Sequence, residues 1–154
     1  MRFIKLLAFF LVINFGGLAI GSLLMANGPQ TEWYTTLNQA PWTPAGWVFG
    51  VAWTTIMLCF SFYLAKLFYD FDSLFLRIFF SIQVFLNVVW NYIFFNQHLV
   101  GLGLLVIILL TLVIFYFFFK YRMDYMQRVK YLLLPYMIWL LIATSLNAYI
   151  FLYN

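Results

Sequence analysis

The amino-acid sequence predicts an all-α fold, an integral membrane bundle of five transmembrane helices. Of the 154 residues, 67% belong to the set AVILMFWYC and only 8% are charged, whereas soluble domains have about half apolar and a quarter charged residues. Five apolar runs of about 20 residues pass without a charge, and this is the length that a helix needs to cross a bilayer. The basic residues all fall on one side of the resulting topology.

The first apolar run, Leu6 to Met25, follows two basic residues and predicts a helix over about 3–25. A cleaved signal peptide is the alternative. However, the run is longer than the apolar core of a usual signal, about 7 to 15 residues, and it lacks a small residue at the expected place before its end. We therefore expect the helix to remain in the mature protein. The next segment, 26–45, contains three of the four prolines and predicts a loop that forms a lid.

The remaining helices lie between the charged and polar turns that separate the other apolar runs. We expect them at about 46–68, 74–95, 100–119 and 130–152. These runs are continuously apolar and about twice as long as the alternating strands of a membrane barrel, so helices are the better interpretation. We expect one domain over residues 1–154, with no appended soluble catalytic or nucleic-acid-binding module and with the lipid bilayer as its solvent.

Every basic residue lies on the membrane face that holds the amino terminus. The set is Arg2, Lys5, Lys66, Arg77, Lys120, Arg122, Arg128 and Lys130. Lys and Arg are enriched in the cytoplasmic loops of membrane proteins. This distribution predicts that the amino terminus lies inside, and that the first loop and the carboxyl terminus lie outside. We expect a bacterial cell membrane rather than an organelle membrane.

Amide, aromatic and small residues recur every three or four positions along three of the expected helices, so each set shares one helix face. The sets are Gly46, Gly50, Trp53, Met57 and Ser61; Gln83, Asn87, Trp90, Asn91 and Phe94; and Tyr136, Trp139, Ala143, Asn147 and Ile150. Counted from the outer ends at 1.5 Å per residue, the amides Asn87, Asn91 and Asn147 lie within roughly 12 Å of the outer surface. The polar stripes therefore cluster in the outer half of the membrane.

Polar side chains in a membrane span usually face the bundle interior or a cavity, where they find partners. Two interpretations of the stripes stay open. The residues could only hold helices together, as small and amide residues often do. Alternatively, they line a cavity for a flat aromatic ligand, which stacks on indole rings and is oriented by a few amides. In the second case Trp33, Tyr34 and Trp42 of the first loop would cover the cavity.

Conventional catalytic and metal chemistry has no candidate residues in the sequence. Cys59 is the only cysteine and His98 the only histidine, so we expect no disulfide and no metal site. No acidic residue lies within a span to act as a general base or proton relay. The sequence also lacks the Gly-x-Ser-x-Gly and His-Glu-x-x-His motifs. We expect no obligatory cofactor.

Three segments of the chain carry a resemblance to a known family. They are Trp33-Tyr34 with Pro41-Trp42-Thr43-Pro44-Ala45-Gly46, Phe49-Gly50 and Trp53; then Leu86-Asn87-x-x-Trp90-Asn91-x-x-Phe94-Phe95; and finally Pro135-Tyr136-x-x-Trp139-x-x-x-Ala143-x-x-Leu146-Asn147. In this order they resemble the TspO/MBR family, the tryptophan-rich sensory or translocator proteins, over the whole chain. Ala45 stands where the family usually has a second proline, and Asn91 where it commonly has serine, which concerns ligand preference more than fold.

The resemblance implies a five-helix membrane protein, often a homodimer. It implies binding of porphyrins, such as protoporphyrin IX or haem, and of benzodiazepine-type drugs in an outer-half pocket under the first loop, and sterols are ligands of some members. The positions that match the family pocket are Tyr34, Trp53, Asn87, Trp90, Asn91, Trp139, Ala143 and Asn147. We add Trp42, because of its place in the lid loop, to the ligand-binding candidates.

The resemblance also names two candidate catalytic residues. Trp53 and Trp139 match tryptophans proposed in some members to react during light- and oxygen-dependent porphyrin breakdown. Three function classes therefore remain open. The chain is a porphyrin receptor or sensor that also moves or sequesters its ligand, an enzyme that degrades porphyrin, or a structural membrane protein without a small ligand.

Overall fold

The computed structural model describes residues 1–121 and 123–154 and contains no strand among them. Arg122, which we assigned to the inner face, lies outside the described residues. The long helices are α1 (Arg2–Leu24), α3 (Gly46–Asp70), α4 (Leu74–Asn91), α5 (Val100–Lys120) and α6 (Leu134–Tyr153). Within the described residues, these five helices, three of them extended by short helical segments, are long and apolar enough to cross a membrane. The all-α fold with five membrane-spanning helices is confirmed, and the chain is an integral membrane protein.

Shorter helical segments modify the expected boundaries. They are η1 (Gly28–Gln30), α2 (Glu32–Thr36), the π-helical η2 (Tyr92–Asn96), η3 (Asp124–Met126) and η4 (Val129–Leu133). The first two lie in the segment 26–45, where we expected only a loop. Pro29 opens η1, and the hydroxyl oxygen of Thr31 accepts the backbone N–H of Tyr34, which caps the first turn of α2. Short local capping signals thus form helical turns in an otherwise irregular segment.

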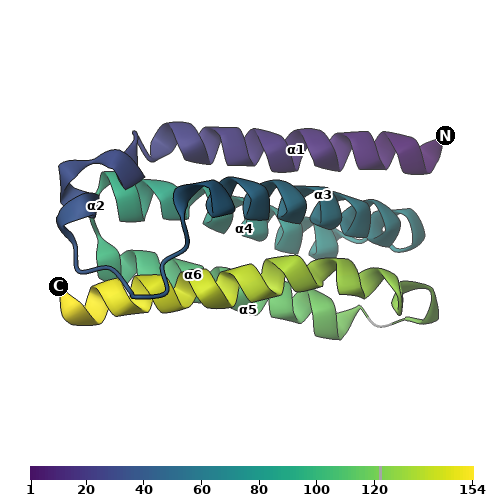
Figure 1. The fold of residues 1–154 in the computed structure, drawn as a ribbon. Coiled ribbons are helices and arrows are strands. Elements are labelled where there is room, and N and C mark those ends of the chain that lie inside the picture. Colours follow the sequence, from purple (N-terminus) through teal and green to yellow (C-terminus); the bar gives the residue numbers. More distant parts are fainter. Residues whose placement is uncertain (122) are drawn as a thin grey trace.

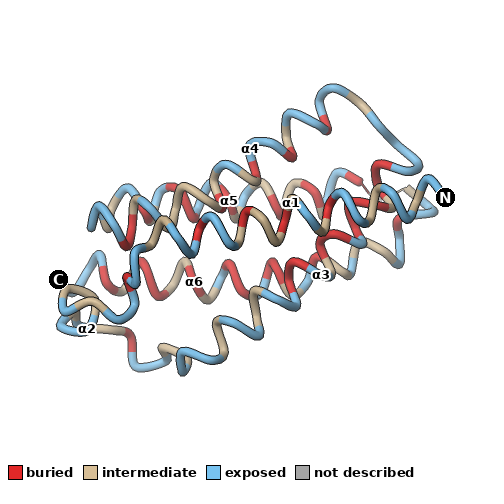
Figure 2. The backbone as a smooth tube through the Cα atoms, turned by 90° about the horizontal axis from the view of Figure 1, so that it is seen from above, coloured by how far each residue is buried: buried red, intermediate tan, exposed pale blue. Residues whose placement is uncertain are grey.

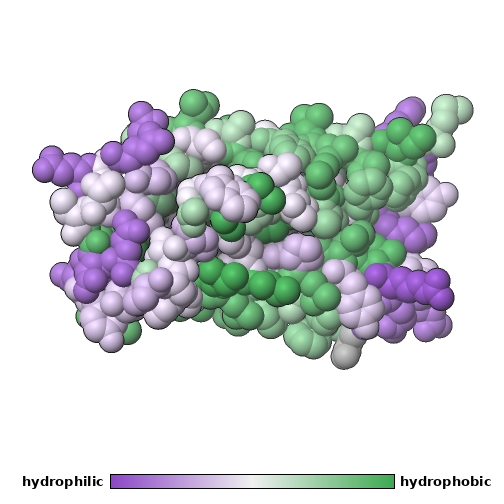
Figure 3. Space-filling model, viewed as in Figure 1, coloured by the Kyte–Doolittle hydropathy of each residue, from purple (hydrophilic) through white to green (hydrophobic). Residues whose placement is uncertain are grey.

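The five long helices form a closed bundle around a shared interior. Helix α1 packs against α3 and α4, α4 packs against α5, α5 packs against α6, and α6 returns to α3. Successive long helices alternate in direction, so the amino and carboxyl termini lie at opposite ends (Figure 1). Figure 3 shows a hydrophobic band across the middle of the bundle between two more hydrophilic ends. We call the end that holds the amino terminus the basic end and the end that holds residues 26–45 the loop end.

Among the described residues, two ion pairs lie at the basic end. The Lys66 ammonium is 2.8 Å from a carboxylate oxygen of Asp70, one turn further along α3. Arg77 donates to both carboxylate oxygens of Asp72, at 2.9 and 2.6 Å. The hydrogen bond from Arg77 lowers the pKa of Asp72 below its ordinary value. Asp70 and Asp72 are therefore each matched by a neighbouring cation.

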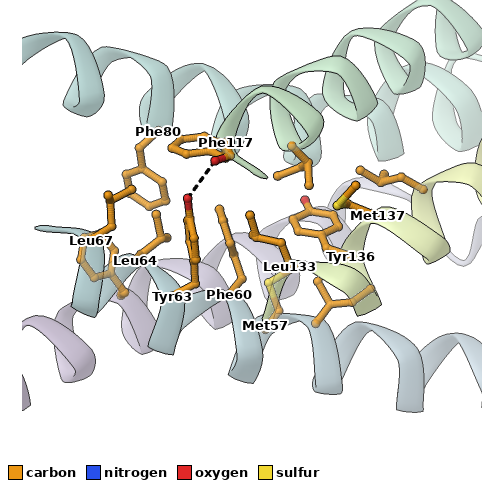
Figure 4. Packing of buried hydrophobic residues seen from close by; sticks show 14 of the residues in the cluster. Met57, Phe60, Tyr63, Leu64, Leu67, Phe80, Phe117, Leu133, Tyr136 and Met137 are labelled. Carbon is orange, nitrogen blue, oxygen red and sulfur yellow. Dashed lines mark hydrogen bonds between the residues drawn. The ribbon is translucent and has the colours of Figure 1, made fainter. Parts of the chain in front are cut away.

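A dense aromatic core fills the bundle between α3, α5 and α6. Phe60, Tyr63, Phe117 and Tyr136 are fully buried there, and Tyr63 donates its hydroxyl proton to the carbonyl oxygen of Phe117 at 3.1 Å (Figure 4). Buried residues follow the inward sides of the long helices (Figure 2). Protein interiors contain few voids, so a cavity elsewhere in the bundle would be an exception to this close packing.

Buried polar side chains join the helices in pairs. Asn14 of α1 donates to the Ser61 hydroxyl of α3 at 2.8 Å, and Gln83 of α4 donates to the Tyr136 hydroxyl of α6 at 3.0 Å. Such interhelical bonds contribute about 0.6 kcal/mol each in a membrane. These two bonds favour one rotation of α1 relative to α3 and of α4 relative to α6, with these polar faces toward the interior.

Candidate ligand cavity at the loop end

Two adjoining cavities lie at the loop end of the bundle. The larger, of about 330 Å³, is lined by Met25, Pro29, Tyr34, Gln39, Thr43, Pro44, Gly46, Phe49, Trp53, Trp90, Asn91, Phe95, Ile107, Trp139 and Ala143. The smaller, of about 250 Å³, lies between α1, α3 and α4 and is lined by Leu18, Ser22, Met25, Phe49, Gly50, Trp53, Thr54, Asn87 and Asn91. They share four lining residues, so a ligand in one cavity lies next to the other.

Helices α3 and α6 hold Trp53 and Trp139 at the larger cavity through edge-on aromatic contacts. The ring centre of Phe49 lies 5.1 Å from that of Trp139, at an interplanar angle of 85°. The ring centre of Trp53 lies 6.0 Å from that of Tyr136, at 76°. Edge-to-face geometry is the favoured arrangement for aromatic pairs. Each indole is therefore held by a neighbouring ring while it also faces the cavity.

Trp90 of α4 is fixed from two sides. Its ring stacks on Phe94 at 5.3 Å, and its indole nitrogen donates to Oδ1 of Asn147 at 3.2 Å. The Asn147 nitrogen in turn donates to the carbonyl oxygen of Val100 at 3.1 Å. Asn147 lines neither cavity, and its amide is engaged by protein groups on both sides. Its role in this geometry is to position Trp90.

The amides of Asn87 and Asn91 differ from that of Asn147. Asn91 lines both cavities and donates to the backbone carbonyl oxygen of Asn87 at 3.1 Å. Asn87 is only 9% exposed and lines the smaller cavity, and within the described residues its side-chain amide has no hydrogen-bond partner. This side chain therefore offers a donor and an acceptor to a group inside the cavity.

The first loop supplies part of the wall of the larger cavity through Tyr34, Gln39 and Thr43. Gln39 donates its amide N–H to the Tyr34 carbonyl oxygen at 3.0 Å, which ties the loop to α2. A Cβ atom on Gly28 would overlap the ring of Phe95, so glycine permits this close approach. Burial raises the pKa of the Tyr34 hydroxyl above its ordinary value.

Trp42 does not line either cavity. Its indole nitrogen donates to the Ser145 hydroxyl at 3.1 Å, its ring lies edge-on to Tyr149, and 54% of the residue is exposed. Trp33 is also held away from the larger cavity, because it stacks on His98 at 4.0 Å. These two tryptophans fasten the loop to the helices beneath it.

The chain is similar in sequence to proteins of one known family. The TspO/MBR family profile matches residues 9–153. The chain belongs to the TspO/MBR family. It is 33% identical over 160 residues to the tryptophan-rich protein TspO of Archaeoglobus fulgidus, with 100% of this chain and 99% of that protein covered. It is 31% identical over 120 residues to protein CrtK of Rhodobacter capsulatus, with coverage of 75% and 74%. The tryptophan-rich sensory protein of Cereibacter sphaeroides is 31% identical over 117 residues, with coverage of 75% and 73%.

Most residues that the resemblance to TspO/MBR proteins selected are brought together at the loop end. Tyr34, Trp53, Trp90, Asn91, Trp139 and Ala143 line the larger cavity, and Asn87 lines the smaller one. Trp42 and Asn147 line neither. Sequence reasoning missed several apolar and polar lining residues, among them Met25, Gln39, Thr43, Phe49, Phe95 and Ile107. Of these residues, only Phe49 could have been predicted to line the cavity, because it lies one helical turn before Trp53 on the same face of the helix.

The cavities of this TspO/MBR protein offer stacking surfaces and neutral hydrogen-bonding groups. No lining residue of either cavity carries a formal charge at neutral pH. Among the described residues there is no group of three or more His, Cys, Asp or Glu side chains that could hold a metal ion. The lining therefore suits a flat, largely apolar ligand with a few polar atoms.

Proposed function

We propose that this TspO/MBR protein is a membrane receptor or sensor that binds porphyrins, such as protoporphyrin IX or haem, and benzodiazepine-like ligands. One observation carries the proposal: Trp53, Trp90 and Trp139 line a single cavity of about 330 Å³ at the loop end of the bundle. Indole rings stack on flat aromatic ligands, and ligand pockets usually have volumes of about 300 to 1,000 Å³. The smaller cavity adds adjoining space and the unpartnered Asn87 amide.

A tryptophan-fluorescence titration with protoporphyrin IX in detergent tests the proposal. We expect saturable quenching in the wild type and a clear loss of its amplitude in Trp139→Phe, because Trp139 faces the cavity. Trp47→Phe is the matched control, since Trp47 is 73% exposed and lines neither cavity. Absence of saturable quenching in the wild type would contradict the proposal and favour a structural membrane protein without a small ligand.

A second candidate function is light- and oxygen-dependent degradation of porphyrin. The observation that favours it is that Trp53 and Trp139 line the same cavity. An indole donates one electron to a light-excited porphyrin without an acid or base, and dioxygen is the co-reactant. Illumination of the loaded protein separates the two functions: loss of porphyrin absorbance with a new product band, abolished in Trp53→Phe and Trp139→Phe, supports the enzyme. Unchanged spectra support the receptor.

We further propose a bacterial cell membrane, with the amino terminus inside and the loop end outside. The one-sided set of eight basic residues supports this orientation. We propose a homodimer, transport or sequestration of the bound porphyrin, and a sterol as a further ligand class, because some family members have these properties. Cross-linking in native membranes tests the dimer, and competition of a sterol with bound porphyrin tests the last proposal.

A further inference from the structure

The second half of the first loop forms a strap over the larger cavity. We define the strap as residues 37–45, which connect α2 to α3. Gln39, Thr43 and Pro44 of the strap line the larger cavity. In Figure 1 the chain runs from α2 beside the carboxyl-terminal end of α6 before it turns to α3. The position of the strap therefore depends on what holds it to α6.

One amide side chain pairs with both backbone polar groups of Asn38. The backbone nitrogen of Asn38 donates to Oδ1 of Asn154 at 2.8 Å, and the Asn154 nitrogen donates to the Asn38 carbonyl oxygen at 3.2 Å. The same nitrogen also donates to the carbonyl oxygen of Ile150 at 3.0 Å, in the last turn of α6. This third bond holds the Asn154 side chain in the orientation that receives the strap.

A second contact fastens the strap to α6 further along the same helix. There the Trp42 indole donates to Ser145 and lies edge-on to Tyr149. The lining residues Gln39 and Thr43 thus lie close to two attachments, Asn154 on one side and Ser145 on the other. Loops that close over ligands often control ligand release.

We propose that Asn154 is a latch, a positioning residue that holds the strap closed over the larger cavity and slows ligand release. Asn154 lines neither cavity and acts through the backbone of Asn38, which adjoins Gln39. The proposal rests on the proposed function only for the identity of the ligand. The closure of the strap itself is a property of the empty protein and is tested separately.

Hydrogen exchange of the strap amides in the ligand-free protein tests the closure. Asn154→Ala removes both hydrogen bonds to Asn38, and we expect exchange of that amide to accelerate about tenfold with an unchanged melting temperature. Asn96→Ala is the matched control, because Asn96 is an exposed asparagine whose side-chain oxygen accepts a hydrogen bond from neighbouring Gln97, far from the strap in sequence. Unchanged exchange in Asn154→Ala, or equal acceleration in the control, would overturn the latch.

Stopped-flow release of protoporphyrin IX from the same variants tests the effect on ligand exchange. We expect an off-rate about tenfold higher in Asn154→Ala, a smaller change in the on-rate, and wild-type rates in Asn96→Ala. Ser145→Ala, which removes the hydrogen bond of the second attachment, should raise the off-rate further when combined with Asn154→Ala. Faster exchange of the strap without faster release would overturn the gating role. A wild type that binds no porphyrin would overturn the proposed function and any gating of porphyrin, while hydrogen exchange would still decide whether Asn154 holds the strap.

Discussion

The indole nitrogen of Trp90 donates a hydrogen bond to Oδ1 of Asn147 at 3.2 Å. This bond distinguishes Asn147, whose side-chain amide has protein partners, from Asn87, whose side-chain amide has none among the described residues. Asn147 is 2% exposed and bonded at both ends of its amide. Asn87 is nearly as buried, but its amide faces a cavity without a partner among the described residues. Substitutions of the two residues should therefore have different effects on stability and on ligand affinity.

Asn147→Leu should lower both stability and porphyrin affinity. The substitution leaves the Trp90 N–H without its acceptor, which costs about 1 to 3 kcal/mol for a buried polar group, and it also removes the side-chain hydrogen bond to the Val100 carbonyl oxygen. It also releases the Trp90 ring that lines the larger cavity. Thermal melting and a protoporphyrin IX titration in the same detergent measure the two effects. A wild-type melting temperature would show that the Trp90–Asn147 bond does not stabilise the bundle.

Asn87→Leu should weaken porphyrin binding and leave the melting temperature unchanged. Leucine has the same number and branching of side-chain heavy atoms as asparagine, and no hydrogen bond between described protein groups is lost from the side chain. A polar ligand edge that loses its partner in a dry pocket costs about 1 to 3 kcal/mol, roughly tenfold or more in affinity. The same melting and titration experiments apply. Unchanged affinity with a lower melting temperature would remove Asn87 from the site and assign it to helix packing.

Gly21→Ala should reduce affinity by displacing the Asn91 side chain. A Cβ atom on Gly21 would lie 2.7 Å from the Asn91 amide nitrogen, so this side chain, which lines both cavities, must move. Gly17→Ala is the matched control on the same face of α1, because its Cβ would lie 3.6 Å from a methyl group of Val88, an ordinary contact. We expect a several-fold weaker protoporphyrin IX affinity in the first variant only. Equal affinities would show that the ligand does not contact Asn91.

The membrane spans could be predicted because their signal is local. A run of about 20 apolar residues without a charge has few alternatives in a chain with a mean hydropathy of +1.00. The π-helical segment Tyr92–Asn96 was not predictable, because no proline or glycine marks it. Its presence depends on tertiary packing, in which Phe94 and Phe95 are both buried.

The candidate site could be predicted only as far as the helix faces. The spacing of Asn147 identified an inward face, but the same face contacts both the larger cavity, through Ala143, and the neighbouring Trp90. Periodicity cannot separate a ligand from a protein partner. Loop residues carry no periodicity. For this reason neither the hydrogen bond from Trp42 to Ser145 of α6 nor the position of Gln39 at the cavity could be predicted.

The proposed orientation predicts different accessibility for two introduced cysteines. In a Cys59→Ser background, Glu32→Cys at the loop end should react with an impermeant thiol reagent added to intact cells. Asp124→Cys at the basic end should react only after the membrane is permeabilised. The reverse pattern would overturn the orientation and leave the cavity in place, since the cavity is located relative to the loop end of the bundle.

A porphyrin that occupies the larger cavity would be displaced by a side chain that fills this cavity. Ala143 lines the cavity and is 9% exposed, so Ala143→Phe places a ring where the ligand would lie. Ala19→Phe on the exposed surface of α1 is the control for an added aromatic side chain. We expect protoporphyrin IX affinity to fall at least tenfold in Ala143→Phe, with a melting temperature close to that of the wild type, and to be unchanged in Ala19→Phe. Wild-type affinity in a folded Ala143→Phe protein would show that the porphyrin does not bind in this cavity.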